Sequence, residues 1–403
     1  MPKRLMLTIG LSCWSTLVWA DAASDCSQDK NIDLRIEGCT RFIKQNPNIA
    51  GAYENRGLAY LDRGDWDRAI ADATNAIKIN PRYGAAYQGR AFAYAKIGDY
   101  DHSIADSTRA IELDPKLVPP YQARAFAYAK IGDDDRAIAD LTKAIALDPK
   151  LAAAYDSRSL TYLNKGDLDR SFADANKLVE LNPRKATAYH LRSVIAAQRG
   201  DYDQSIADAS KALELDPKLT TAYESRSLAY FDKGDWDPCI ADASKAIELD
   251  PKLATAYNRR GAAQSEKGDY GQSISDANKA IEIDPKFAAA YNTRSWAYVR
   301  IGNYDRGIAD ATKAIDLNPK LAAAYNSRGL AFAKMGDYDR AIADAAKAID
   351  LNPKLAAAYG TRGFAFAKKG DVKSAIADYR RQLALAPNNH SSKEVLQHLG
   401  ASP

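Results

Sequence analysis

The stretch Ala322–Leu355, AAAYNSRGLAFAKMGDYDRAIADAAKAIDLNPKL, is one copy of a unit that fills most of the 403-residue chain. Its closing proline recurs every 34 residues, at Pro47, Pro81, Pro115, Pro149, Pro183, Pro217, Pro251, Pro285, Pro319, Pro353 and Pro387. Ten complete units lie between the first and the last of these prolines. A fixed period of this length indicates a stacked array of small units, each of which is too short to bury a core alone.

Each unit is predicted to form two antiparallel helices. Tyr325, Gly329 and Phe332 follow the i, i+4, i+7 spacing of one helical face. Gly336 can adopt the left-handed conformation that ends this first helix, and Asp337 can cap the start of the second. The proline ends the second helix, because the residue before a proline avoids the helical conformation.

The first helix of every unit carries a small residue where the two helices must approach closely. These residues are Gly57, Ala91, Ala125, Ser159, Ser193, Ser227, Gly261, Ser295, Gly329 and Gly363. A large side chain at this position would force the two backbones apart. The pattern therefore predicts tight helix pairs throughout the array.

These features resemble the tetratricopeptide repeat family, whose unit is a 34-residue helix–turn–helix. The matching pattern is aromatic, small, aromatic on the first helix, then Gly-Asp, then small residues and a proline on the second. In the first copy these residues are Tyr53, Gly57, Tyr60, Gly64, Asp65, Ala69, Ala76 and Pro81. The resemblance covers Asn48 to Pro387 and implies an all-α, right-handed superhelical solenoid. In this family the first helices line a concave groove that holds a protein or a peptide.

Residues 1–22 have the composition of a secretory signal peptide, as in an exported bacterial-type array. Lys3 and Arg4 precede the apolar run LMLTIGLSCWSTLVW, and Ala20 and Ala22 offer cleavage sites. The run is too short for a comfortable membrane span. We therefore expect an exported protein, periplasmic or secreted, with no integral membrane segment in the mature chain.

The ends of the array differ from its repeats. Residues 23–47 match the second half of a unit and are predicted to be an N-terminal capping half-repeat, residues 48–387 are the ten repeats, and residues 388–403 are a C-terminal capping helix and tail. Cys26 and Cys39 occupy positions that face each other in a complete unit. In an exported protein this favours a disulfide over two buried thiols. Such a bridge would contribute about 3 kcal/mol in the chain-entropy model.

Two charged rows run through the repeats. Ten arginines share one position of the first helix: Arg56, Arg90, Arg124, Arg158, Arg192, Arg226, Arg260, Arg294, Arg328 and Arg362. Ten aspartates share one position of the second: Asp72, Asp106, Asp140, Asp174, Asp208, Asp242, Asp276, Asp310, Asp344 and Asp378. The family usually has an apolar residue at the arginine's place. We interpret the rows as a structural ion-pair ladder, either within or between repeats; the alternative is an arginine row that binds an anionic partner.

Specificity is expected at the groove-lining positions, which vary more. The apolar row is Leu58, Phe92, Phe126, Leu160, Val194, Leu228, Ala262, Trp296, Leu330 and Phe364, and the polar row includes Asp156, His190, Glu224, Asn258, Asn292 and Asn326. Such rows suit an extended peptide, with pockets for its side chains and hydrogen bonds for its backbone. Alternatively, the apolar row packs adjacent units. Partial exposure of Phe92, Phe126 and Trp296 would favour binding.

No residue pattern indicates catalysis, a metal site or a cofactor. Asp156, His190 and Glu224 fall on successive groove helices. Packed helices lie roughly 8–10 Å apart, whereas hydrogen-bonded partners or shared metal ligands need about 2–3 Å. Some family members hold a C-terminal carboxylate with lysine, asparagine and arginine. Only Asn55 and Arg259 fit that chemistry here, in distant units, so we expect a different recognition mode.

The sequence therefore predicts a non-enzymatic scaffold that binds a protein or an extended peptide in its groove. It has 56 lysine and arginine residues against 52 aspartate and glutamate residues, evenly mixed, which gives no support to nucleic-acid binding. Two alternatives remain at this point: a substrate-recruiting accessory subunit of a separate envelope enzyme, and a saccharide-binding module that uses tyrosine, tryptophan and amide side chains. The oligomeric state is left open.

Overall fold

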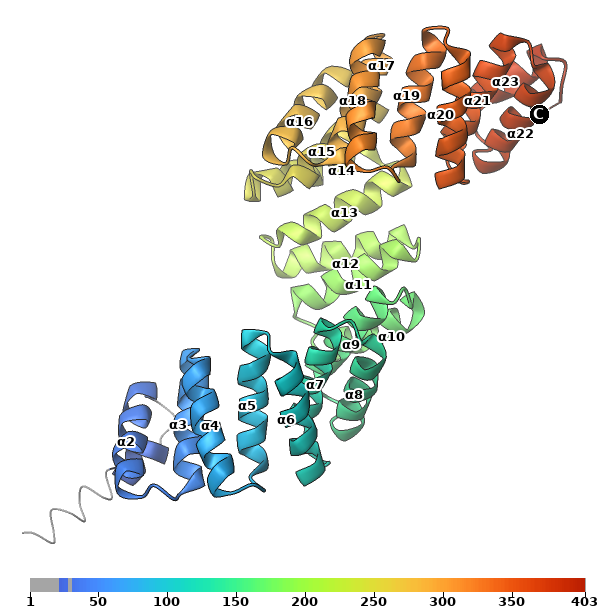
Figure 1. Ribbon diagram of the computed structural model, residues 1–403. Helices are drawn as coiled ribbons and strands as arrows, with labels where there is room; N and C mark the ends of the chain where they lie inside the picture. Colours follow the sequence, from blue (N-terminus) through green and yellow to red (C-terminus); the bar gives the residue numbers. More distant parts are fainter. Residues whose placement is uncertain (1–21, 28–30, 403) are drawn as a thin grey trace, which may run out of the picture. The chain divides into compact units, whose positions relative to one another are not determined.

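The computed structural model describes residues 22–27 and 31–402, which fold into helices joined by short turns (Figure 1). No strand occurs among these residues. The all-helical prediction is therefore confirmed. The predicted signal peptide, residues 1–22, lies outside the described residues except for Ala22.

Two helices form each repeat. After the helical residues 22–27, the helices are α2 (Ile32–Gln45), α3 (Ala50–Arg63), α4 (Trp66–Ile79), α5 (Gly84–Ile97), α6 (Tyr100–Leu113), α7 (Val118–Lys130), α8 (Asp134–Leu147), α9 (Ala152–Asn164), α10 (Leu168–Leu181), α11 (Ala186–Gln198), α12 (Tyr202–Leu215), α13 (Thr220–Lys233), α14 (Trp236–Leu249), α15 (Ala254–Glu266), α16 (Tyr270–Ile283), α17 (Ala288–Arg300), α18 (Tyr304–Leu317), α19 (Ala322–Lys334), α20 (Tyr338–Leu351), α21 (Ala356–Lys369), α22 (Val372–Leu385) and α23 (His390–His398). We call the odd-numbered helices α3 to α21 the A helices of the repeats, and the even-numbered helices α4 to α22 the B helices.

The chain divides into two compact units, Met1–Arg184 (unit 1) and Lys185–Pro403 (unit 2). In each unit an A helix packs on the B helix of its repeat, and that B helix packs on the next A helix. Successive A helices also contact each other, and in the described part no comparable packing joins successive B helices. The A helices therefore line the inner side of each stack.

Glycine and aspartate make the turn inside nine of the repeats, as predicted, and Gly302 and Asn303 make it in the repeat of α17 and α18. Gly336 has a φ of +87°, a conformation that other residues adopt at a cost. The Asp337 N–H donates to the Phe332 carbonyl at 2.9 Å, and its carboxylate accepts from the Arg340 N–H at 3.1 Å. These bonds satisfy groups that the helix ends would otherwise leave without partners.

The side-chain cap is missing at the start of α14, and the sequence explains why. Asp235 begins α14 without a hydrogen bond to its side chain. In the first repeat the cap carboxylate of Asp65 accepts from the N–H of Arg68, three residues on. Pro238 stands at that place in α14, and proline has no N–H to donate.

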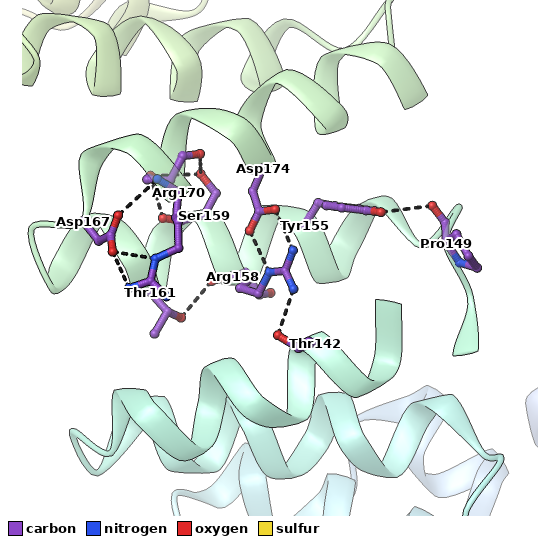
Figure 2. Close-up of polar contacts among 11 residues, drawn as sticks. Thr142, Pro149, Tyr155, Arg158, Ser159, Thr161, Asp167, Arg170 and Asp174 are labelled. Carbon is purple, nitrogen blue, oxygen red and sulfur yellow. Dashed lines mark hydrogen bonds and ion pairs between the residues drawn. The ribbon is translucent and has the colours of Figure 1, made fainter. Parts of the chain in front are cut away.

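The small-residue position is a point of close contact between A and B helices. A Cβ atom placed on Gly329 would lie 3.2 Å from the Ala341 carbonyl oxygen, tighter than ordinary contact. Where the residue is serine, its hydroxyl makes a bond instead: Ser159 donates to the Ser171 carbonyl at 2.9 Å (Figure 2). The position therefore accepts only side chains that need almost no space.

In most repeats the arginine bonds to the B helix of its own repeat and to the B helix of the preceding repeat. Arg158 donates from Nε and Nη2 to the two carboxylate oxygens of Asp174 in its own repeat, both at 2.8 Å, and from Nη1 to Thr142 of the preceding repeat at 2.8 Å (Figure 2). The hydrogen bonds to Asp174 raise the pKa of Arg158. The charge pair thus lies within a repeat, and the third bond lies between repeats.

All ten arginines, including Arg90 with Asp106 and Arg328 with Asp344, make the two-bond contact with their aspartate. Arg362 faces Ala346 where other repeats have threonine, serine or asparagine, and only its bonds to Asp378 occur. All ten guanidinium groups are therefore bonded within the array, so no row of free guanidinium groups remains for an anionic partner.

Both ends of the array are covered. Cys26 and Cys39 form a disulfide that links the helical residues 22–27 to α2. Both sulfur-bearing residues are buried with Ala52 of the first complete repeat. At the other end, α23 places Leu396 against Ala375 and Tyr379 of the last B helix. Each terminal repeat thus has a partner for its outer face.

We expect Asp344→Ala to destabilise the eighth and ninth repeats by about 2–3 kcal/mol, because it leaves the partly buried guanidinium of Arg328 without its carboxylate. The side chains of Arg328 and Asp344 are 21% and 12% exposed. Long arrays unfold in parts, so hydrogen exchange of α19 and α20 should be measured beside urea unfolding.

Asp339→Ala is the matched control for this variant. Asp339 lies in the same repeat and pairs with Lys369 of the next, yet its side chain is 83% exposed. Exposed ion pairs contribute little, so exchange should be unchanged. Equal exchange rates for Asp344→Ala and Asp339→Ala would contradict a structural role for the arginine row.

Candidate functional site

The inner side of unit 1 carries a row of exposed apolar side chains. Leu58, Phe92, Phe126 and Leu160 lie on α3, α5, α7 and α9 and are 40%, 43%, 48% and 45% exposed. The residue before each of them is buried against the B helix of its own repeat. This degree of exposure favours a binding surface over packing between repeats. These four residues are the apolar row of unit 1.

Neighbouring side chains hold the two phenylalanines of the apolar row. The Trp66 ring meets the Phe92 ring edge to face at 6.2 Å between centroids, and Tyr100 meets Phe126 in the same way at 6.3 Å. The ammonium of Lys96 lies 5.1 Å from the Phe92 centroid. The rings are therefore preorganised.

In unit 2 the corresponding apolar positions are less exposed. Val194, Leu228, Trp296, Leu330 and Phe364 are all partly buried. The guanidinium of Arg300 lies 5.6 Å from the Trp296 ring centroid. Trp296 thus meets the condition of partial exposure, although less openly than Phe92 and Phe126.

The asparagines of the polar row link successive A helices of unit 2. Asn258 accepts from Thr293 at 2.8 Å, Asn292 from Ser327 at 2.9 Å, and Asn326 from Thr361 at 2.8 Å. Asn258 and Asn292 remain partly exposed. Asn326 is only 5% exposed. The prediction that Asn326 lines the open groove therefore does not hold, because burial removes this side chain from the open surface.

A pocket of about 310 Å³ opens between α11, α13 and α15 of unit 2. His190, Glu224 and Arg259 supply its polar lining, and Val194 and Leu228 supply apolar walls. Burial lowers the pKa of His190 and of Arg259. The pocket therefore offers a neutral imidazole beside a cation and a carboxylate.

The pocket's polar groups are held by their neighbours. His190 Nδ1 lies 3.4 Å from the Ser225 hydroxyl, and Glu224 accepts a hydrogen bond from Thr255. The Arg259 guanidinium lies 5.3 Å from the Phe231 centroid and forms no ion pair with a described residue. A polar side chain or a peptide group of a ligand can form hydrogen bonds with His190, Glu224 and Arg259.

A comparison of equivalent positions across the repeats would have singled out Arg259 in the sequence. Its position in the A helix is otherwise uncharged: Asn55, Gly89, Ala123, Ser157, Leu191, Ser225, Thr293, Ser327 and Thr361. A single charge in an uncharged row marks a repeat that differs from its siblings. The resemblance to the family draws attention to Arg259 only as part of a carboxylate clamp.

Asp156, His190 and Glu224 lie on three successive A helices, the first in unit 1 and the other two in unit 2. Asp156 is partly buried on α9 of unit 1. His190 and Glu224 bond to Ser225 and Thr255 rather than to each other. No three histidine, cysteine, aspartate or glutamate residues among those described are placed to hold a metal ion. None of the described helices is long and apolar enough to cross a membrane.

Models of the tetratricopeptide repeat match most of the chain. They cover residues 50–83, 84–117, 118–151, 152–185, 186–219, 254–287, 277–309, 322–355 and 356–389, and a TPR repeat model covers residues 228–268. No curated protein matches the sequence.

Several solved structures are similar to the chain at low sequence identity. The Cut9 complex with Hcn1, described as an APC/C hetero-tetramer, is 15% identical, with a TM-score of 0.51 over 97% of this chain and 96% of that one. YrrB, described as a TPR protein with an unusual peptide-binding site, is 22% identical, with a TM-score of 0.40 over 46% of this chain and 95% of that one. A tetratricopeptide repeat protein from Parabacteroides merdae is 20% identical, with a TM-score of 0.48 over 62% and 98%. The chain belongs to the tetratricopeptide repeat family and has its protein-binding scaffold fold.

Proposed function

We propose that this protein is a non-enzymatic scaffold that binds an extended segment of another protein along the A helices. The observation that carries the proposal is the apolar row of unit 1, whose four large side chains are 40–48% exposed at intervals of one repeat. Leaving such a row in water is unfavourable. A partner that covers the row therefore gains the free energy of removing this apolar surface from water.

The scaffold's rigidity supports binding of an extended segment. The A helices of unit 1 are fixed by their arginine–aspartate contacts, and Trp66 and Tyr100 hold two rings of the apolar row. A surface that is already ordered loses little conformational entropy when a ligand binds. The pocket at His190, Glu224 and Arg259 offers a separate anchoring point in unit 2 for a polar group.

We also propose that the protein is exported to an oxidising compartment. The positively charged start, the apolar run and the small residues at Ala20 and Ala22 support export. The Cys26–Cys39 disulfide fits the same compartment, because structural disulfides are rare where cellular thiols are kept reduced.

Peptide selection tests the binding function. The chain from Asp21 onward is screened with a phage-displayed dodecapeptide library whose members are fused at their C-termini. We expect enriched peptides to lose about tenfold or more in affinity for the double variant Phe92→Ala/Phe126→Ala, because each ring buries apolar area worth about 1.5–3 kcal/mol when covered. Fluorescence anisotropy of the synthesised peptides measures this loss.

Ile97→Ala/Ile131→Ala is the matched control for this experiment. Both isoleucines are 48% exposed at the C-terminal ends of α5 and α7, away from the apolar row. Their removal should leave affinity unchanged. A library that yields no binder for the wild-type chain, or a loss confined to the isoleucine variant, would refute the proposal.

Export and the disulfide make a joint prediction about thiols. The chain has four cysteines, and cleavage after Ala20 removes Cys13. Alkylation of the mature, denatured protein without reductant should label only Cys239, while prior reduction should add Cys26 and Cys39. Intact mass should place the N-terminus at Asp21. Retention of residues 1–20, or labelling of Cys26 without reductant, would contradict this proposal.

A further inference from the structure

Two adjacent repeats of unit 1 present the same inner surface twice. The sequence RAFAYAKIGD occurs at residues 90–99 and again at residues 124–133. On α5, Gln88, Phe92 and Lys96 follow one another at four-residue spacing, and on α7 a second glutamine–phenylalanine–lysine triplet does the same. Residues four apart lie on one face of a helix. Each triplet therefore forms one step of a repeated surface.

In both steps the lysine stands over the phenylalanine. The Lys96 ammonium lies 5.1 Å from the Phe92 centroid, and the Lys130 ammonium lies 5.4 Å from the Phe126 centroid. All four side chains are exposed. A cation over a ring keeps its outward N–H groups available to a further partner.

Neither lysine has an ion-pair partner among the described residues. Other cations of unit 1 do have one: Lys165 pairs with Asp135 at 2.6 Å. The glutamines of the two triplets, Gln88 and Gln122, are neutral. Asp62, at the lysine's place in the preceding repeat, already pairs with Arg35. The two steps therefore form a local cationic surface without an internal counter-charge.

Leucines of the apolar row flank the two steps, and the charged side chains at the neighbouring positions are acidic: Glu54 and Asp62 on α3 and Asp156 on α9. Leu58 precedes them on α3 and Leu160 follows on α9, with exposures of 40% and 45%. Two cations are too few for a nucleic acid, whose affinity depends on many phosphate contacts. A polypeptide with an acidic centre and apolar ends matches this order of side chains.

The spacing of the steps restricts the ligand further. Helices α5 and α7 are in direct contact, and packed helices lie about 8–10 Å apart. A polyproline II chain rises about 3.1 Å per residue and repeats its side-chain direction every third residue. Residues i and i+3 of such a chain are therefore separated by about one repeat of the scaffold.

We propose that the surface formed by Phe92, Lys96, Phe126 and Lys130 binds an extended acidic segment of a partner protein. Carboxylates at i and i+3 pair with the two lysines, and apolar side chains beside them cover the two rings and the flanking leucines. The carboxylates belong to internal aspartate or glutamate residues rather than to a chain end. This inference rests on the proposed function and specifies its ligand.

Charge reversal of the two lysines in the full mature chain tests this proposal, with the same phage-displayed dodecapeptide library. Peptides enriched on the wild-type chain should carry aspartate or glutamate at i and i+3 next to apolar residues. Lys96→Glu/Lys130→Glu should reduce their affinity at least tenfold and should instead enrich lysine- or arginine-bearing peptides. Lys96→Gln/Lys130→Gln should weaken binding less and should lower its dependence on salt.

Lys116→Glu/Lys150→Glu is the matched control, because both lysines are exposed in turns of unit 1 away from the A-helix surface. It changes the net charge equally and should leave affinity unchanged. Circular dichroism at rising temperature checks that every variant stays folded.

Three outcomes would overturn the inference: enriched peptides without acidic residues, equal affinity for the wild-type and Lys96→Glu/Lys130→Glu chains, or equal losses in the control. If these peptides still lose affinity for Phe92→Ala/Phe126→Ala, the scaffold function stands and only the ligand assignment fails. If no peptide binds the wild-type chain, both fail.

Discussion

In most repeats the stack depends on a guanidinium that bonds to oxygens from two other helices. Arg158 takes two oxygens from Asp174 of its own repeat and one from Thr142 of the preceding repeat. The donors of a guanidinium have a fixed planar geometry, so these bonds restrict how three helices are placed around one point. Burying such a group is favourable only when its partners are all in place. Each repeat therefore constrains its neighbour.

Because the stack is held by the arginines, the small-residue contacts and the Gly-Asp turns, the inner positions are free to differ. Unit 1 uses them for phenylalanines beneath lysines, open to solvent. Unit 2 uses them for an asparagine ladder and for the pocket around Arg259. One scaffold thus presents two surfaces of different chemistry. Their difference arises from the side chains at the inner positions of the A helices.

Much of the fold was predictable because it is local. The turn at Gly336 and Asp337 needs one left-handed residue and one cap, and both are visible in the sequence. The missing cap at Asp235 follows from Pro238, although the prediction treated all caps alike. The partners in the ion-pair ladder were also predictable, because each arginine has an aspartate at a constant separation. The sequence did not predict whether each bond lies within a repeat or between repeats, because spacing along the chain does not fix the direction of a side chain.

The sequence by itself determined the repeat length, the helix pairs and the residues that face one another within a repeat, since these depend on contacts less than one period apart. Only the tertiary structure decided which inner side chains remain open. Phe92 and Asn326 both occupy predicted groove positions, yet Phe92 is 43% exposed and Asn326 is 5% exposed. Exposure depends on how closely the next A helix approaches and on what its side chains cover, as Thr361 does for Asn326. That packing is a property of neighbouring repeats together, and no single repeat encodes it.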